Sequence, residues 1–143
     1  MCLFCRNEPI TEYLKYSSGG VLNIPQCDKL SKIPSIEGVK GLRELRCADL
    51  SNLTSIDTKQ CGNSLRSIWI ENCPELISIP EFPQAKTMFV INCPKLTSIQ
   101  PMHNLKRLIV VHCPNLEQAP ADAIQGSGPL NNFDRLKIRR RAL

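Results

Sequence analysis

Apolar residues recur along the chain with the same spacing inside each segment and a regular interval between segments. In the segment 65–80 the apolar positions are Leu65, Ile68, Ile70, Cys73, Leu76 and Ile79. Apolar residues fill the same six positions in segments that begin at residues 42, 85 and 105, and a weaker copy begins at Gly19. An incomplete sixth copy contains Phe133, Leu136 and Ile138. Five aligned copies at intervals of 20 to 23 residues indicate a repeat protein.

The spacing within each copy predicts a short strand followed by a turn. Two apolar residues separated by one outward residue point to the same face of a strand, and the later Cys, Leu and Ile positions bring the chain back inward. A single coil cannot bury this face, but stacked coils can, and their strands then form a parallel sheet. Twenty residues leave no room for a helix on the return path, and prolines there favour extended segments. We therefore expect an α/β-class repeat solenoid that is mostly β, right-handed and curved, with the sheet on its concave side and irregular, helix-poor convex loops.

The shared pattern is L-x-x-L-x-L-x-x-C-x-L-x-x-I-P. It resembles the leucine-rich repeat family, whose template is L-x-x-L-x-L-x-x-N/C-x-L. The C-P-x-L-x-S-I-P ending is similar to repeats of plant resistance receptors, and the 20-residue copies resemble the short bacterial type. A small chain built only of such repeats also resembles those coded by large DNA viruses of amoebae. The resemblance covers residues 19–141, which implies about five full repeats and a partial terminal one.

Residues 1–18 precede the first repeat and are expected to cap the first coil. Their apolar residues are Leu3, Phe4, Ile10, Tyr13, Leu14 and Tyr16. Pro9 could open a short helix, and the run Ser17-Ser18-Gly19-Gly20 could instead form the turn of a hairpin. The sequence leaves both alternatives open. Longer loops are expected at 57–64 and 121–132.

The chain has eight cysteines, and their positions argue against a disulfide framework. Cys27, Cys73, Cys93 and Cys113 occupy one repeat position, which Leu50 fills in the second copy. They are therefore interpreted as small buried apolar residues whose side chains run parallel, in poor geometry for disulfides. Reduced thiols predict an intracellular protein, cytoplasmic or nuclear.

No arrangement of residues in the sequence indicates an enzyme or a cofactor. A Ser/His/Asp set, a carboxylate pair and a glycine-rich phosphate loop are all missing. Cys2 and Cys5 form the only C-x-x-C motif, and a zinc site would need a second pair of ligands. Packing in the cap is the favoured interpretation, and metal binding by this pair is left open. His112 follows Asn72 and Asn92 in its repeat column, which makes it a rim residue rather than a catalytic one.

Residues between the core positions of each strand should face out of the concave side. An apolar block lies in the middle of these outward positions, and it contains the only tryptophan of the chain. Aromatic and aliphatic anchors with a polar and basic rim are typical of a binding hot spot. Single outward apolar residues are also normal on strands, which is the competing interpretation. The predicted partner-binding residues are Trp69, Phe89, Ile91, Ile109 and Val111, with Arg46, Arg107 and Lys137 at the rim.

The net charge of +5 comes from the end of the chain, because the last nine residues contain five basic ones. The other positions balance at 13 basic and 13 acidic residues, which is a neutral body with a basic tail. No apolar run is long enough to span a membrane. We therefore expect a non-enzymatic scaffold that binds a protein partner or a second copy of itself. The alternative is a nuclear or nucleic-acid-associated factor that acts through the basic tail; nucleic-acid binding by the neutral body is not expected.

Overall fold

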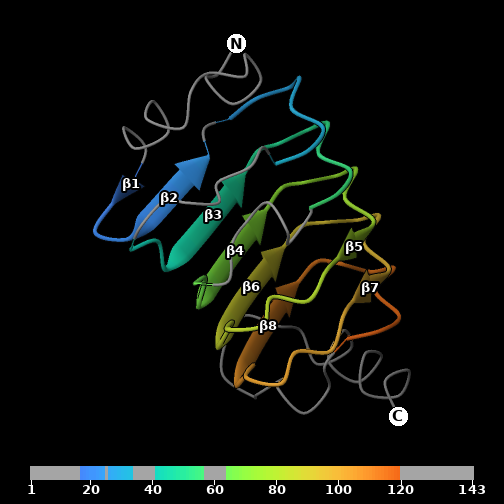
Figure 1. Cartoon of the computed structure of the whole chain (residues 1–143). Coiled ribbons are helices and arrows are strands. Elements are labelled where there is room, and N and C mark those ends of the chain that lie inside the picture. Colours follow the sequence, from blue (N-terminus) through green and yellow to red (C-terminus); the bar gives the residue numbers. More distant parts are fainter. Residues whose placement is uncertain (1–16, 25, 34–40, 57–63, 120–143) are drawn as a thin grey trace.

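The computed structural model describes residues 17–24, 26–33, 41–56 and 64–119. Six strands form one sheet in the order β1-β2-β3-β4-β6-β8 (Figure 1). A second sheet of two short strands, β5 and β7, lies on the return path of the chain. The strands are β1 (Ser17–Ser18), β2 (Val21–Ile24), β3 (Glu44–Ala48), β4 (Ser67–Glu71), β5 (Ser78–Ile79), β6 (Thr87–Ile91), β7 (Ser98–Ile99) and β8 (Arg107–Val111).

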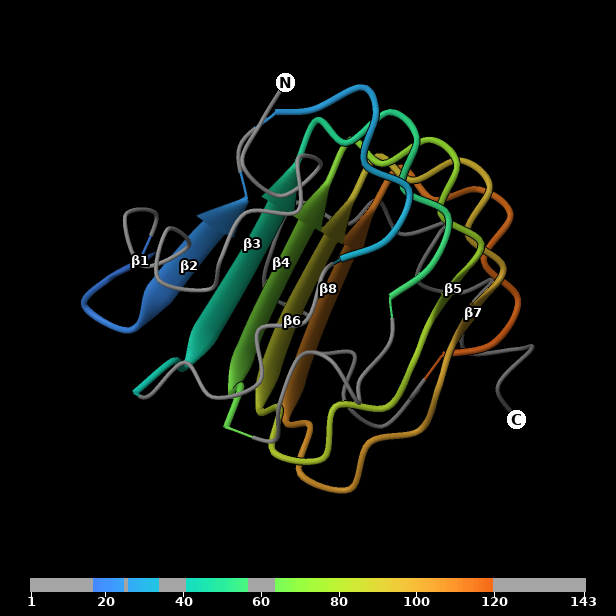
Figure 2. The ribbon, with the colours of Figure 1, turned by 45° about the horizontal axis from the view of Figure 1, so that its top comes forward.

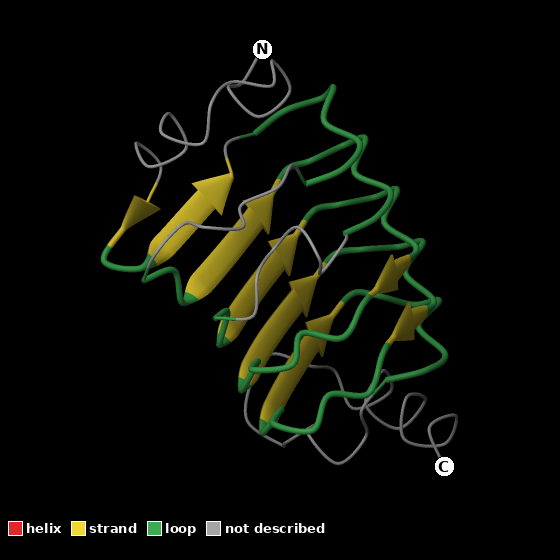
Figure 3. Ribbon diagram, viewed as in Figure 1, coloured by secondary structure: helices red, strands yellow, loops and turns green. Residues whose placement is uncertain are grey.

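Strands β2, β3, β4, β6 and β8 stack in parallel, one from each coil (Figure 2). The register places equivalent repeat positions side by side, so that Leu45 lies opposite Ile68 and Ile68 lies opposite Met88. The result is a β-solenoid of about four turns. The return segments are irregular apart from β5 and β7, and no helix occurs in the part of the chain that the structure describes (Figure 3). The predicted parallel sheet and helix-poor return path are confirmed.

The core consists of the inward side chains of the sheet and of the turns that follow it. In β4 the residues Ile68 and Ile70 are completely buried, whereas Ser67, Trp69 and Glu71 between them are only half-buried. The later positions of the same repeat are also completely buried, namely Cys73, Leu76 and Ile79. No polar or charged side chain is buried among the described residues. The predicted apolar positions therefore form the core, except Gly19 of the first copy, which is exposed in the hairpin turn, and Ala119 of the fifth copy, which is only partly buried.

A hairpin precedes the first parallel strand. β1 pairs antiparallel with β2, and Ser18 lies opposite Val21. The two residues between them, Gly19 and Gly20, have φ angles of 61° and 84°, as a two-residue hairpin turn requires. A Cβ at Gly20 would come within 2.9 Å of the Gly41 carbonyl oxygen, so a side chain there would force the backbone to move. The hairpin alternative is confirmed for these residues, and the helix alternative at Pro9 lies outside the described ones.

The five described cysteines are buried, and none of them is joined in a disulfide. Each of Cys73, Cys93 and Cys113 directs its thiol to the carbonyl oxygen two residues earlier, at 3.5 Å. Burial raises the pKa of the Cys73 thiol to about 12, and the neighbouring Cys93 adds to the shift. A hydrogen bond from the Cys113 side chain lowers the pKa of Cys93, against the effect of burial. The interpretation of these cysteines as core residues is confirmed, and Cys2, Cys5 and Cys61 lie outside the described residues.

Candidate interaction surface

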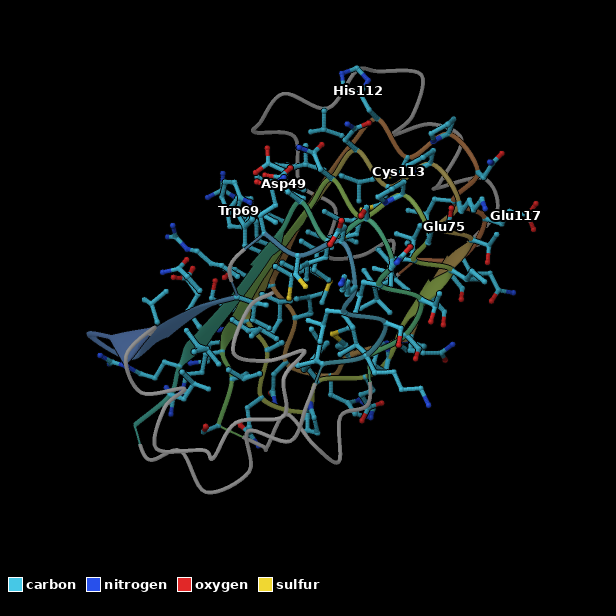
Figure 4. The ribbon with its side chains drawn as sticks, turned by 90° about the horizontal axis from the view of Figure 1, so that it is seen from above. Asp49, Trp69, Glu75, His112, Cys113 and Glu117 are labelled. Carbon is cyan, nitrogen blue, oxygen red and sulfur yellow. The ribbon has the colours of Figure 1, made fainter. Side chains whose placement is uncertain are left out.

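The outer face of the six-stranded sheet, which is the side turned away from the core, corresponds to the predicted concave face. The register aligns its side chains in columns across the coils. One column contains Arg46, Trp69, Phe89 and Ile109. Figure 4 shows Trp69 on one side of the molecule and Glu75 and Glu117 on the opposite side, with the sulfur atoms of the core between them. Trp69 therefore belongs to the sheet face and not to the return segments.

Aromatic and guanidinium groups form a continuous stack on this face. The ring centroids of Trp69 and Phe89 are 4.8 Å apart, and the ring planes are inclined by 31°. The Arg46 guanidinium lies 5.7 Å from the centre of the Trp69 ring, and that of Arg107 lies 6.0 Å from the centre of the Phe89 ring. Both distances allow an attractive interaction between a cation and an aromatic ring. The structure thus brings together four predicted site residues, which we name the Arg–Trp–Phe–Arg stack.

Polar contacts hold the stack in place from the neighbouring columns. The indole Nε1 of Trp69 donates a hydrogen bond to Glu71 at 3.3 Å. The Nε of Arg46 donates to the Glu44 carboxylate at 3.2 Å, and that carboxylate also accepts a hydrogen bond from the Ser67 hydroxyl at 3.1 Å. The Arg46 side chain nevertheless remains 49% exposed. The stack is therefore held by contacts within the sheet face itself, and part of it is open to solvent.

The predicted apolar block is smaller than the sequence suggested. Ile109 is only 3% exposed and Val111 only 8%, so the prediction that both lie on the surface is wrong. Both belong to the hydrophobic core cluster, and their partners in register, Phe89 and Ile91, pack against that cluster. An outward position on a strand fixes the direction of a side chain but not what covers it. The half-buried residues Trp69, Phe89 and Ile91 are the apolar part of the block that remains accessible.

Lys137 was predicted as a rim residue, but it lies outside the described residues together with the rest of the basic tail. The same holds for the partial sixth repeat and for most of both long loops. The rim is therefore represented by Arg46 and Arg107 alone.

A polar column at the carboxyl ends of the strands was only partly anticipated. Asp49, Asn72, Asn92 and His112 all have left-handed backbone conformations, with φ between 53° and 59°. The Nδ2 of Asn92 donates to the Oδ1 of Asn72 at 2.7 Å, and the Nδ2 of Asn72 donates to the Oδ1 of Asp49 at 2.9 Å. Among residues other than glycine, Asn, Asp and His are enriched at positive φ, so their recurrence at one repeat position was the signal for this turn.

An open cavity of about 460 Å³ lies beside this polar column. Its lining residues are Gln26, Asp28, Asp49, Ser51, Asn72, Pro74, Asn92 and Pro94. The cavity holds two carboxylates and no basic side chain. His112 extends the column beyond the cavity and is exposed, as expected for a rim residue.

Comparisons with known proteins add no further constraint. No family model, no curated protein and no solved structure matches the chain. Within the described ranges, no three His, Cys, Asp or Glu side chains are grouped so that they could hold a metal ion. A search of the same ranges found no helix with the length and apolar character needed to cross a membrane. The function is therefore inferred from the geometry of the chain itself.

Proposed function

We propose that the chain is a leucine-rich-repeat protein of intracellular location that acts as a non-enzymatic protein-interaction module through the outer face of its sheet. The family assignment is supported by the repeat pattern and by the stacking of its equivalent positions in register. Cys27, Cys73, Cys93 and Cys113 share one repeat position and form the cysteine column. Their buried thiols are consistent with a reducing compartment.

The single observation that carries the proposal is the Arg–Trp–Phe–Arg stack. Trp and Arg are the residues that dominate binding energies at protein interfaces, and rigid anchors lose little conformational entropy on binding. Trp69 and Phe89 fix one another, and Arg46, Arg107 and Glu71 restrain them further. A surface with this degree of order favours binding of a partner over a purely structural role.

The size of the apolar area limits the kind of contact. A large aromatic side chain contributes about 150–250 Å² when it is fully buried, and Trp69 and Phe89 are already half-buried. A stable interface covers about 800 Å² on each partner, so the stack and Ile91 cannot supply such an area alone. A second copy or another protein must therefore also cover the polar columns beside the stack.

The test is the double change Trp69→Ser plus Phe89→Ser. Neither residue occupies one of the six core positions, so the circular dichroism spectrum should remain that of the native fold. Binding of a captured protein partner, or self-association in analytical ultracentrifugation, should fall by more than about tenfold, as expected when two interface anchors are truncated.

The matched control is Ile77→Ser. Ile77 is 53% exposed and follows Leu76 on the return path, away from the sheet face. This change removes a comparable exposed apolar side chain and should leave binding unchanged. A folded double variant that binds every partner of the native chain would exclude the sheet face as the functional surface.

A further inference from the structure

A row of basic residues borders the sheet face at the amino ends of the strands. Arg43, Arg66, Lys86 and Lys106 each immediately precede a long strand, in four consecutive coils. All four side chains are exposed. The overall charge balance of the body concealed this row, because acidic residues elsewhere compensate for it. We name these four residues the basic row.

The backbone explains why these side chains project outward in register. The carbonyl oxygen of Arg43 accepts hydrogen bonds from the amides of both Arg66 and Ser67, at 2.7 and 3.1 Å. The carbonyl oxygens of Arg66 and Lys86 accept two consecutive amides of the next coil in the same way. In each coil the basic residue and the residue after it both stay outside the core, so the strict alternation of a strand begins only afterwards. The row is thus fixed by the repeat itself.

Within the described ranges, no acidic side chain pairs with the basic row. None of its four side chains forms an ion pair or a side-chain hydrogen bond with another of the described residues; the ion pairs there join Arg46 to Glu44 and Lys95 to Glu75. Like charges in neighbouring strands repel one another. The opposite end of the sheet carries the two carboxylates of the cavity, Asp28 and Asp49. The sheet face therefore has a positive border at one end and a negative border at the other.

The dimensions of the row fit a short extended peptide. Adjacent coils are separated by about 4.8 Å, so four coils span about 14 Å. An extended chain advances about 3.3 Å per residue, and four to five residues would therefore cover the row. A peptide in this position runs across the strands. Trp69 and Phe89 follow Arg66 and Lys86 by three residues, about 10 Å along the strand, which a large apolar side chain of the peptide has to bridge.

The stack distinguishes an acidic polypeptide from a single-stranded nucleic acid. Surfaces that bind single strands offer free ring faces on which bases stack. Trp69 lies between Arg46 on β3 and Phe89 on β6, and Phe89 lies between Trp69 and Arg107. Each ring is therefore flanked by a guanidinium and by the other ring, which leaves less ring surface for a stacked base and keeps the aromatic pair available for contact with an apolar side chain. This geometry favours an acidic segment that also carries an apolar residue.

We infer that the basic row docks an acidic stretch of the polypeptide that binds the sheet face, while an apolar side chain of the same stretch contacts Trp69 and Phe89. The inference rests on the proposed function and specifies the chemistry of the partner. Charge complementarity along the row supplies orientation and a faster association rate, and the aromatic contact supplies the apolar area.

The test uses the full chain and a fluorescent peptide of glutamates with one central phenylalanine. The double change Arg66→Gln plus Lys86→Gln should weaken binding by about 3- to 10-fold, as expected for the loss of two exposed charge pairs. The control double change Lys32→Gln plus Lys95→Gln removes the same charge from the return path and should leave the affinity within about 2-fold. Fluorescence anisotropy at low and at physiological ionic strength measures both, and binding should weaken as salt screens the charges.

Further variants and probes distinguish the roles of the basic row and of the aromatic anchors, and separate peptide binding from nucleic-acid binding. Charge reversal with Arg66→Glu plus Lys86→Glu leaves two positive and two negative charges in the row and should abolish the preference for the acidic peptide over the corresponding lysine peptide. Equal effects of the row and control variants would overturn the inference, as would tighter binding of a single-stranded oligonucleotide than of the acidic peptide. If the row variant binds normally while Trp69→Ser plus Phe89→Ser does not, the basic row is excluded and the proposed function stands. If only the row variant loses binding, the row is supported and the aromatic anchors are excluded.

Discussion

Leu76 and its neighbour Glu75 provide a direct test of the register of the solenoid. The side chain of Leu76 is completely buried in a middle coil, between the equivalent residues Leu53 and Leu96, which are also completely buried. Glu75 points outward, with 43% of its side chain exposed, and it pairs with Lys95 at 2.7 Å. Two adjacent residues thus have opposite environments, and their substitution by alanine should have very different effects.

The magnitudes follow from these environments. Leu76→Ala removes buried methyl and methylene groups worth about 0.8 kcal/mol each and leaves a cavity, so we expect a loss of about 2–5 kcal/mol. Glu75→Ala removes one exposed ion pair, which should cost at most about 0.5 kcal/mol. Since the total stability of such a domain is about 5–15 kcal/mol, the Leu76 change removes a large part of it.

Urea denaturation followed by circular dichroism measures both changes, and the fluorescence of Trp69, the only tryptophan, provides a second probe of the same transition. The midpoint should fall clearly for Leu76→Ala and remain nearly unchanged for Glu75→Ala. Equal shifts of the two midpoints would refute the register, because a displacement by one residue would exchange their environments.

Two further predictions concern the cysteine column and the polar column. Cys73 should react with a thiol reagent only after unfolding, because burial raises its pKa to about 12 and keeps the thiol protonated; two or more disulfides in protein purified without oxidant would contradict this. Because the raised pKa favours the protonated thiol in the folded state, the stability that Cys73 contributes is complete below pH 9.0, the ordinary pKa of this thiol in the unfolded chain. That stability is lost as the pH rises towards 12, by about 1.4 kcal/mol per pH unit. Cys73→Ala should reduce this pH dependence when unfolding by urea is measured at alkaline pH. Asn72→Ala should lower the free energy of unfolding by about 1–3 kcal/mol, because it removes two hydrogen bonds and leaves at a φ of 53° a side chain that forms no hydrogen bond to offset the backbone strain. Asn72→Gly loses the same hydrogen bonds without the backbone strain, so a glycine variant less stable than the alanine variant in thermal unfolding would be evidence against this account.

The sequence itself determined the repeat, the parallel sheet, the helix-poor return path and the identity of the core. Positions such as Ile68, Cys73 and Leu76 could be assigned because every coil contacts mainly its neighbours, and each position packs against its own equivalents. A periodic pattern of apolar residues therefore contains nearly all the information that the stacking requires. The columns of outward residues, including the one that joins Arg46, Trp69 and Phe89, follow from the same register.

The tertiary structure decided what the outward positions become. Ile109 and Val111 face outward by pattern but are buried, because burial depends on what lies against the strand as well as on its direction. The ring distances of the stack depend on side-chain torsions that periodicity does not specify. The basic row had a sequence signal, a Lys or Arg at one repeat position, but a net charge sums over the molecule and carries no information about where charges gather. The backbone hydrogen bonds before the strands keep Arg66 and its equivalents outside the core and in register. These hydrogen bonds, which the sequence does not show, align the four basic side chains as a continuous charged border.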